Sequence, residues 1–256
     1  MKMQTSMQNT FPREQIIISR TPTQLLTYKP AINQDFVERL LGRRQKCNLP
    51  RTTQKRLTIQ HNRLQELINP RVTWKEFSIA QIEKTGVTLD SGTSFKSRKM
   101  SRAFQGATSV VGFIATIGQR IDREIESLMN GGALAHGYVA DSLGSGAVES
   151  LADRFHNDVA KEVGRQDHSV GLRFSPGYCD WPVTEQQKLF SLLDNKAVGV
   201  KLSNTSLMTP RKSISALFGI FETKDGLPKN SKHNPCRRCG KKDCIARRVE
   251  AVPPLH

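Results

Sequence analysis

The feature that most constrains the fold of this 256-residue chain is a long helical pattern between Ala133 and Val163. Its apolar side chains recur at helical intervals, at Val139, Leu143, Val148, Leu151, Phe155 and Val159. This spacing predicts one long helix that buries one face. Gly144 and Gly146 lie in its middle, and each costs roughly 1 kcal/mol relative to alanine in a helix. Glycines at such positions indicate close approach by another backbone or by a ligand.

The segments around this helix mix further helices and strands. Helical periodicity is present in residues 33–44, 53–68 and 97–104, and another helix is expected to begin near residues 116–118 and to end at Met129. Strands are expected in residues 86–92, 108–118, 196–204 and 213–221, and the most apolar of them, 108–118, is predicted to be buried. Because no regular βαβ rhythm is present, the pattern favours an α+β fold with a mainly antiparallel twisted sheet flanked by helices.

The chain is strongly basic, and its charge is unevenly distributed. Lys and Arg number 39 against 23 Asp and Glu, which gives a net charge of +16. Residues 1–80 hold 14 Lys and Arg against five acids, and residues 229–248 hold eight against one. A field of this kind attracts acidic partners, among which nucleic acids and acidic redox proteins are both candidates.

Three of the five cysteines lie within nine residues near the C-terminus, at Cys236, Cys239 and Cys244. This clustering differs from the evenly spread cysteines of a disulfide scaffold, and it suits a metal site. An iron–sulfur cluster would take Cys179 or Cys47 as its fourth ligand. Zinc would instead use the three thiolates together with His233. Thiols without a metal are the third interpretation, and for Cys179 a buried apolar thiol is an equal alternative.

The loop of residues 173–178, Arg-Phe-Ser-Pro-Gly-Tyr, combines groups that suit a small ligand. Arg173 offers a planar set of donors for a carboxylate. Pro176 and Gly177 form a turn pair, and Gly177 lets the backbone come close to a bound molecule. Tyr178 adds an aromatic face with a hydroxyl group. The loop therefore predicts a site for a carboxylate and a flat ring, and the alternative is a surface turn whose arginine pairs with a nearby acid.

A polar stripe accompanies the apolar stripe of the long helix. Asp141, Ser145 and Glu149 are spaced four residues apart and so share one helical face. Two carboxylates on that face could contact an ammonium group, a sulfonium group or ribose hydroxyls. The alternative is a solvated helix edge.

Four separated segments, taken in order, resemble the reactivation domain of cobalamin-dependent methionine synthase. They are FKSRKMSRAFQGATSVVGFIATIG, VADSLGSGAVESLADRF, RFSPGYCDWPVTEQQKLFSLLD and GVKLSNTSLMTPRKSISALFGI. The third segment is similar to the family's Arg-Pro-Ala-Pro-Gly-Tyr loop and the helix after it. The fourth resembles the family's strand with a Met-containing Thr/Ser-rich loop, and the first two resemble free-standing members. The resemblance covers roughly residues 75–222.

The resemblance implies that the loop at Arg173 binds S-adenosylmethionine. Arg173 and Tyr178 match the family's Arg and Tyr, and Ser175 stands where the family has Ala. Arg173 would clamp the methionine carboxylate, and the backbone from Ser175 to Gly177 would form hydrogen bonds with adenine. The change from Ala to Ser at position 175 matters little if residue 175 contacts adenine through its backbone.

On the long helix, the resemblance implies a role for Glu149 as the family's acidic ligand contact. Asp141 and Ser145, on the same face, are further candidates. The family has another acidic contact in an Asp-Trp setting, for which Trp74 and Glu76 are the nearest residues without a clear correspondence.

The function implied by the resemblance is that of a stand-alone reactivator. In the family, an electron from flavodoxin or a similar donor, such as ferredoxin, reduces inert cob(II)alamin, and the methyl group of S-adenosylmethionine traps the product. The chain lacks room for cobalamin, homocysteine and folate modules, so it would act on a separate corrinoid protein or methionine synthase, with its C-terminal cysteines relaying the electron. Whether catalysis is intrinsic to the chain stays open.

The same resemblance divides the chain into three parts. Residues 1–72 form a basic N-terminal helical extension, residues 73–224 form the activation-like domain, and residues 225–256 form a basic Cys-rich tail. No apolar run reaches 18 residues, and the first 20 residues lack the apolar core of a signal peptide. We therefore expect a cytoplasmic protein without membrane contact.

Two other functions remain compatible with the sequence. A nucleic-acid-binding module with structural zinc is favoured by the net charge and by the basic segment NLPRTTQKRLTIQHNRLQ. Against it, aromatic residues make up only 6% of the chain and are not interleaved with the basic residues, so nucleic acid is not the expected partner. The other alternative is a degenerate family member that acts only as a binding partner.

Overall fold

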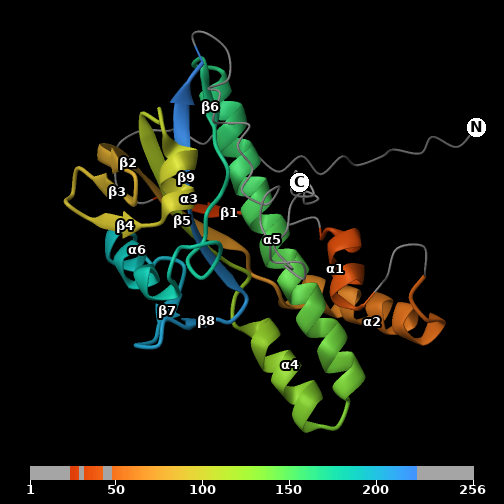
Figure 1. Cartoon of the computed structure of the whole chain (residues 1–256). Helices are drawn as coiled ribbons and strands as arrows, with labels where there is room; N and C mark the ends of the chain where they lie inside the picture. The colour runs from red at the N-terminus through yellow and green to blue at the C-terminus, as the bar shows by residue number, and fades with distance from the viewer. Residues whose placement is uncertain (1–23, 29–31, 43–47, 224–256) are drawn as a thin grey trace, which may run out of the picture.

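The structure is a computed structural model that describes residues 24–28, 32–42 and 48–223. In this part of the chain, a seven-stranded antiparallel sheet lies between helices on both of its faces (Figure 1). The hydrogen-bonded strand order is β4-β3-β2-β5-β9-β6, and β1 pairs with the first half of β2. The expected α+β fold with an antiparallel sheet and flanking helices is confirmed.

The strands differ greatly in length. Those of the main sheet are β1 (Gln24–Thr27), β2 (Arg71–Glu83), β3 (Gly86–Leu89), β4 (Ser94–Lys96), β5 (Ser109–Thr116), β6 (His168–Val170) and β9 (Ser213–Glu222). A separate small hairpin consists of β7 (Lys201–Leu202) and β8 (Met208–Thr209). Strand β5 lies between the two longest strands, and its Phe113 is opposite Trp74 of β2 and Ala216 of β9.

The helices fall into two groups. They are α1 (Gln34–Leu40), α2 (Arg51–Leu67), α3 (Arg98–Phe104), α4 (Arg120–Asn130), α5 (Leu134–Gly164) and α6 (Gln186–Leu192), with a 3-10 turn at η1 (Val183–Glu185). Side chains of α1, α2, α4 and α5 share one core with the sheet, and side chains of α3 and α6 share a second core on the opposite face. Helices α4 and α5 run side by side as a hairpin (Figure 1).

The helix α5 confirms the long helical pattern, within one residue at each end. Its apolar stripe packs onto the sheet through Phe155, whose ring centroid lies 5.0 Å from that of Phe113 and 5.9 Å from that of Trp74. The ring of Phe218 on β9 is 6.2 Å from Phe155. These aromatic contacts fix α5 across the central strands, so any polar group on its flank lies next to the strand ends.

Strand β5 is buried on both faces, as its apolar sequence predicts. All eight of its residues are buried. Because side chains alternate along a strand, Val111 and Phe113 enter the core under α5, whereas Val110 and Ile114 enter the core under α3 and α6. The strand thus serves as the shared wall of two cores, and it holds both layers in place.

The mid-helix glycines of α5 allow close approach by protein groups. A Cβ atom at Gly146 would overlap Cγ2 of Val37 on α1. A Cβ atom at Gly144 would lie 3.1 Å from Cε of Lys212. Both glycines therefore do allow close approach, but the groups that approach are the side chains of Val37 and Lys212 and not the backbone or ligand expected from the sequence.

We expect Gly146→Ala to lower the free energy of unfolding by about 1–3 kcal/mol, because the new methyl group overpacks the contact with α1. Urea denaturation measures this change. Gly164→Ala is the matched control, since nothing lies within 4 Å of a Cβ atom at the end of the same helix. Adding Val37→Ala should recover part of the loss, and equal losses at Gly146 and Gly164 would contradict the packing argument.

Two segments differ from the sequence-based expectations. Residues 71–83 form β2, the longest strand, for which no strand was expected. Residues 196–204 were expected to be a strand, but most of them form turns, and only Lys201 and Leu202 are extended in a strand. Val198 and Val200 are still buried, because Asn195 closes the turn through hydrogen bonds to and from the backbone of Val200. Apolar alternation there reflects burial of a turn.

The N-terminal helices contribute to the core under α5. Leu64 and Leu67 of α2 and Val37 of α1 are buried within it. The division of the chain at residues 72 and 73 stays a prediction, as does the boundary before the tail at residue 225.

Candidate functional site

Two buried cations meet the polar stripe of α5. In chain order, the stripe consists of Asp141, Ser145, Glu149 and Asp153, each four residues after the last. Lys212, just before β9, contacts the first half of the stripe, and Arg173 contacts the second half. The solvated helix edge considered for this stripe is therefore not what the structure shows.

Arg173 lies at the centre of the predicted loop site. Its side chain is only 3% exposed, and Nη2 donates a hydrogen bond to Oε2 of Glu149. Its Nη1 lies 3.3 Å from Oδ1 of Asp153, but it forms no hydrogen bond there, although the atom is buried. The guanidinium thus forms one strong and one weak contact with carboxylates, and it retains unused donor capacity.

The fold positions Arg173 through its neighbour Phe174. The backbone of Phe174 exchanges two hydrogen bonds of 2.8 Å with Leu217 of β9, and its ring packs edge-on against Phe104 of α3. Successive residues of an extended segment point to opposite faces. Because Phe174 is buried on the α3 side, Arg173 points to the α5 side, where Glu149 lies.

The loop after Phe174 is closed by its own backbone. The N–H of Gly177 donates to the carbonyl of Trp181 at 2.9 Å, and the N–H of Tyr178 donates to that of Ser175 at 3.2 Å. Gly177 has a φ of 88°, a left-handed conformation that suits glycine. Trp181 anchors the loop in the core, with its ring 5.5 Å from that of Phe95. The base of the loop is therefore fixed by backbone hydrogen bonds and by Trp181, whereas Tyr178 at its tip is 44% exposed.

Backbone acceptors remain available in this loop. Within the described residues, the carbonyl oxygens of Pro176 and Gly177 accept no hydrogen bond. The adjacent N–H groups of Gly177 and Tyr178 are used inside the loop. A flat heterocycle with an amino group could thus be held by carbonyl acceptors, next to the ring of Tyr178.

Lys212 is a site residue that the sequence did not reveal. Its side chain is only 9% exposed. Its Nζ lies 2.8 Å from Oδ1 of Asp141 and 3.0 Å from Oγ of Ser145, in the space left by Gly144. Gly144 was the only signal in the sequence. Asp141 is therefore engaged by Lys212, about 12 Å along the helix from Glu149 at 1.5 Å per residue.

Asp122 on α4 is the third buried charge in this region. Its Oδ2 accepts a 2.6 Å hydrogen bond from the backbone N–H of Arg211, while its Oδ1 is buried without a partner in the described chain. Burial raises the pKa of Asp122 above its ordinary value of 3.8, against the opposing effects of that hydrogen bond and of the charge of Lys212. The carboxylate fastens the start of α4 to the segment that carries Lys212.

The raised pKa of Asp122 predicts a pH-dependent stability. The folded state binds the proton more tightly than the unfolded chain, so ionisation of Asp122 costs stability as the pH rises from 3.8 through the raised pKa. We expect the stability of Asp122→Asn relative to wild type to increase between about pH 4 and pH 7. Urea denaturation across this range measures the difference, and a constant offset at every pH would refute the prediction.

Of the cysteines predicted as metal ligands, only Cys179 is among the residues that the structure describes. Cys236, Cys239 and Cys244 lie outside the described residues, as does Cys47. Cys179 is exposed at the tip of the loop, so the alternative of a buried apolar thiol is wrong. Among the described residues, no group of three or more His, Cys, Asp or Glu side chains could hold a metal ion.

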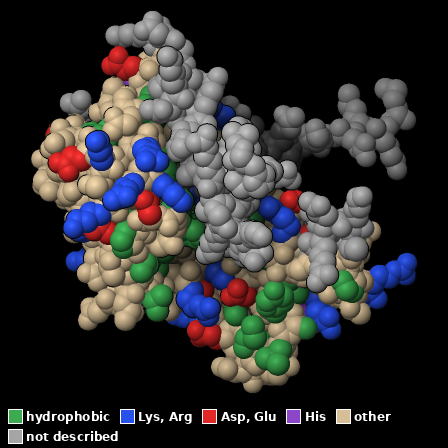
Figure 2. Space-filling view, in the orientation of Figure 1, with side chains coloured by type: hydrophobic (Ala, Val, Ile, Leu, Met, Phe, Trp, Pro, Cys, Tyr) green, Lys and Arg blue, Asp and Glu red, His purple; other side chains and the backbone are tan. Residues whose placement is uncertain are grey.

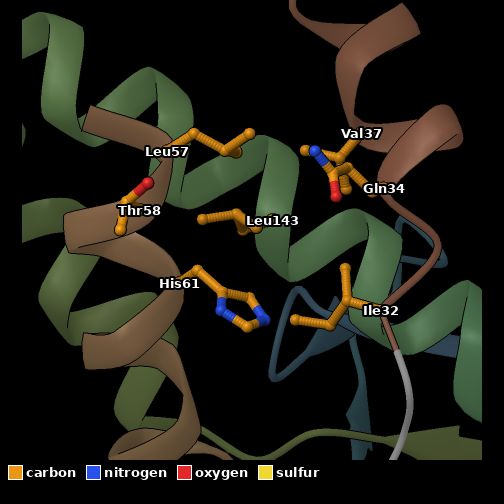
Figure 3. Close-up of a pocket in the computed structure, with 7 residues that line it drawn as sticks. All are labelled: Ile32, Gln34, Val37, Leu57, Thr58, His61 and Leu143. Carbon is orange, nitrogen blue, oxygen red and sulfur yellow. The ribbon is translucent and has the colours of Figure 1, made fainter. Parts of the chain in front are cut away.

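A cavity of about 180 Å³ lies between α1, α2 and α5 (Figure 3). Its walls are Ile32, Gln34, Val37, Leu57, Thr58, His61 and Leu143. None of the predicted ligand residues lines it, and no carboxylate, lysine or arginine does. The residues considered for the family's other acidic contact are also elsewhere. Trp74 is buried under α5, and Glu76 accepts a hydrogen bond from Ser109.

The sequence was compared with models of known protein families to test the resemblance seen in the Arg173 loop and in α5. Residues 100–224 match the family model described as vitamin B12 dependent methionine synthase, activation domain. This segment belongs to that family. The activation domain thus contains α5, the loop at Arg173 and strand β9, which together carry both cations and the polar stripe. Strand β5 and the central part of helix α5 also lie in two of the four segments whose resemblance was noted in the sequence.

A solved structure supports the fold of the activation domain and the elements before it. The crystal structure of the MetH reactivation domain bound to AdoHcy superposes with a TM-score of 0.60 and 17% sequence identity, over 79% of each chain. At this identity, the similarity shows a common fold. No curated protein matches the sequence. Within the described residues, no helix is long and apolar enough to cross a membrane.

Proposed function

We propose that this chain binds S-adenosylmethionine between the Arg173 loop and α5 and supports reductive methylation of cobalamin on a separate protein. The observation that carries the proposal is the buried Arg173 guanidinium, which pairs with Glu149 and keeps an unused donor at the base of the exposed loop. The related solved structure is described as bound to AdoHcy, which is the demethylated form of the same ligand.

The side chains present fit the chemistry of this ligand. A methionine moiety has one carboxylate and one ammonium group, and the site offers one guanidinium and two acids, Glu149 and Asp153. Adenine needs a hydrogen-bond acceptor for its amino group, and the carbonyls of Pro176 and Gly177 supply one. Tyr178 offers an aromatic face beside them. Ser175, in place of the family's Ala, would contribute through its backbone.

Binding would require an exchange of partners at Arg173. Its Nη1 is covered, so a ligand carboxylate would have to replace one of the two acids. Asp153 is the weaker partner, because its side chain is 58% exposed and its contact is 3.3 Å without a hydrogen bond. Glu149 would stay bound to Arg173 and would present its other oxygen to the ligand ammonium. This arrangement orients the ligand without leaving a buried charge unpaired.

When bound, S-adenosylmethionine supplies a methyl group, and the residues of this chain hold and orient it. Asp141 was a further ligand candidate. Because it pairs with Lys212, we propose that it holds α5 against the segment before β9 and does not contact the ligand. The methyl acceptor would be the cobalamin of a corrinoid protein or methionine synthase, and the electron would come from a donor such as flavodoxin or ferredoxin. The basic charge of the chain suits an acidic donor of this class.

Calorimetry with S-adenosylhomocysteine tests the ligand assignment directly. Wild-type protein should bind one molecule per chain, and absence of binding would refute the proposal. A second assay would combine the chain with cob(II)alamin-loaded methionine synthase, a reductant and methyl-labelled S-adenosylmethionine. Label on cobalamin that depends on this chain supports the reactivator role. Binding without label transfer would instead favour a degenerate member that only binds.

The C-terminal cysteines complete the proposal as a metal site, with Cys179 as the candidate fourth ligand. Cys179 is exposed next to Tyr178, and its thiol would join a cluster held by Cys236, Cys239 and Cys244. We expect iron and visible absorption after anaerobic reconstitution, both reduced by Cys179→Ser and abolished by Cys236→Ser. Zinc in a one-to-one ratio without absorption would replace the iron–sulfur assignment, and protein without any metal would refute the site.

A further inference from the structure

A basic surface lies beside the proposed ligand loop, on the face of the sheet opposite α5. It consists of Lys84, Lys96, Arg98, Lys99 and Arg102, which we call the α3 basic surface. Figure 2 shows Lys and Arg side chains gathered over β3, β4 and α3. Within the described residues, none of the five forms an ion pair. Their charge is therefore available to a partner rather than used to stabilise the fold.

Backbone contacts hold these cations in one continuous surface. Lys96 of β4 is in register with Gly86 of β3, two residues after Lys84. Ser101 of α3 donates a hydrogen bond to the carbonyl of Glu83, so α3 lies next to the same turn. The surface therefore joins one end of the sheet to the exposed side of α3.

The α3 basic surface also adjoins the ligand loop. Asp180 accepts hydrogen bonds from Oγ of Ser97 and from the N–H of Lys99. Glu185 accepts a 2.9 Å hydrogen bond from the N–H of Lys96. Through these hydrogen bonds, Asp180 and Glu185 connect the end of β4 and the start of α3 to the segment that follows Tyr178. A protein seated on the cations would therefore reach the loop tip.

An exposed apolar pair lies at the border between the cations and the loop. Tyr178 is 44% exposed and Val183 is 43% exposed. Val183 packs against the loop next to Tyr178, because a Cβ atom at the preceding residue, Gly177, would lie 3.6 Å from Cβ of Val183. An apolar centre with a charged rim is the usual composition of a protein–protein interface. Nucleic acid is a poorer fit, since the cations lack the interleaved aromatic rings that bind bases.

We infer that the α3 basic surface, with Tyr178 and Val183, is the docking surface for an acidic face of the corrinoid-carrying protein. The inference rests on the proposed function. Methyl transfer requires donor and acceptor atoms to approach within roughly 3–3.5 Å, so the acceptor protein must cover the loop that holds the donor. An electron donor needs no such contact. The cations steer the partner and set its orientation, and the apolar pair completes the contact.

Biolayer interferometry can test this surface with the isolated cobalamin-binding module of a cobalamin-dependent methionine synthase as the probe. The variant is Arg98→Glu with Arg102→Glu, two exposed residues on α3. The matched control is Arg51→Glu with Lys55→Glu, two exposed residues on α2, which packs on the opposite face of the sheet. Both variants change the net charge equally, so the comparison isolates position from total charge.

We expect the α3 variant to associate about tenfold or more slowly than wild type at low ionic strength, with the difference closing as salt increases. The α2 variant should retain most of the wild-type rate. Equal loss in both variants, or no binding by wild type, overturns the inference. Salt-dependent binding to duplex DNA that the α3 variant alone loses, without module binding, would assign the surface to nucleic acid and also overturn it.

Calorimetry with S-adenosylhomocysteine separates this inference from the proposed function. Both charge variants should bind this ligand as wild type does, since neither touches Arg173 or Glu149. If wild type binds the ligand but both variants dock equally, the docking surface is wrong and the ligand site stands. If docking depends on α3 but no ligand binds, the docking surface stands and the proposed function falls.

Discussion

Arg173→Ala is expected to weaken binding of S-adenosylhomocysteine by about 100-fold or more, the largest effect on affinity that this structure predicts. Among the described residues, Arg173 is the cation that pairs with Glu149 and Asp153, so without it the ligand carboxylate would meet two acids without this counter-charge. Truncating one partner of a buried, hydrogen-bonded charge pair costs about 2–5 kcal/mol, and 1.4 kcal/mol corresponds to a tenfold change in affinity.

Two control variants make the Arg173 result specific. Arg154→Ala removes another arginine at α5, which pairs with Asp158 on the surface, and it should leave affinity unchanged. Asp153→Ala should bind at least as tightly as wild type, because it removes the acid that competes with the ligand carboxylate. Calorimetry and urea denaturation are needed for each variant. Full affinity in a folded Arg173→Ala protein, or a large loss in Asp153→Ala, would reject the exchange of partners.

Lys212→Met is expected to have the largest effect on stability, on the order of 3 kcal/mol in the free energy of unfolding. Removing one member of a buried ion pair typically costs 3–5 kcal/mol, because the remaining charge is left without compensation. Asp141 is about one-third exposed, which relieves part of this cost and places the expected loss at the lower end. Loss of the nearby positive charge also removes a favourable interaction with Asp122.

A second substitution tests whether the cost comes from the unpaired acid. Lys212→Met combined with Asp141→Leu should be more stable than Lys212→Met alone, because no charge is then left without its partner. Lys161→Met is the control, since its pair with Asp158 is on the surface and its side chain is 73% exposed. Urea denaturation measures all three. Equal losses for Lys212→Met and Lys161→Met would contradict a structural role for the buried pair.

Elements with self-contained patterns were predicted well from the sequence. Helix α5 satisfies its backbone hydrogen bonds internally, so its 3.6-residue apolar stripe was sufficient to locate it. Strand β5 is apolar at almost every position, since both of its faces are buried. These two elements made the α+β class predictable. Helix α5 needs a sheet on which to bury its apolar face, and strand β5 needs helices on both faces of its sheet.

Elements defined by their partners were not predicted. Strand β2 includes the charged pair Lys75 and Glu76, which breaks apolar alternation, and it is a strand because β1, β3 and β5 pair with it. Residues 196–204 alternate well but have few strand partners. Hydrogen bonds between Asn195 and Val200 close a turn there instead. The alternation of apolar residues within a segment indicates which side chains are buried. Whether the segment is a strand depends on pairing with segments distant in the sequence.

The sequence by itself determined the family of the central segment, the long helix and the residue types at Arg173 and Glu149. These depend on local order along the chain, which motifs and periodicity preserve. Only the tertiary structure brought Arg173 to Glu149, carried Lys212 into the space at Gly144 and placed the five cations of the α3 basic surface beside the loop. Buried charges must find counter-charges wherever the fold supplies them, and those partners lie 24 to 71 residues apart in the chain.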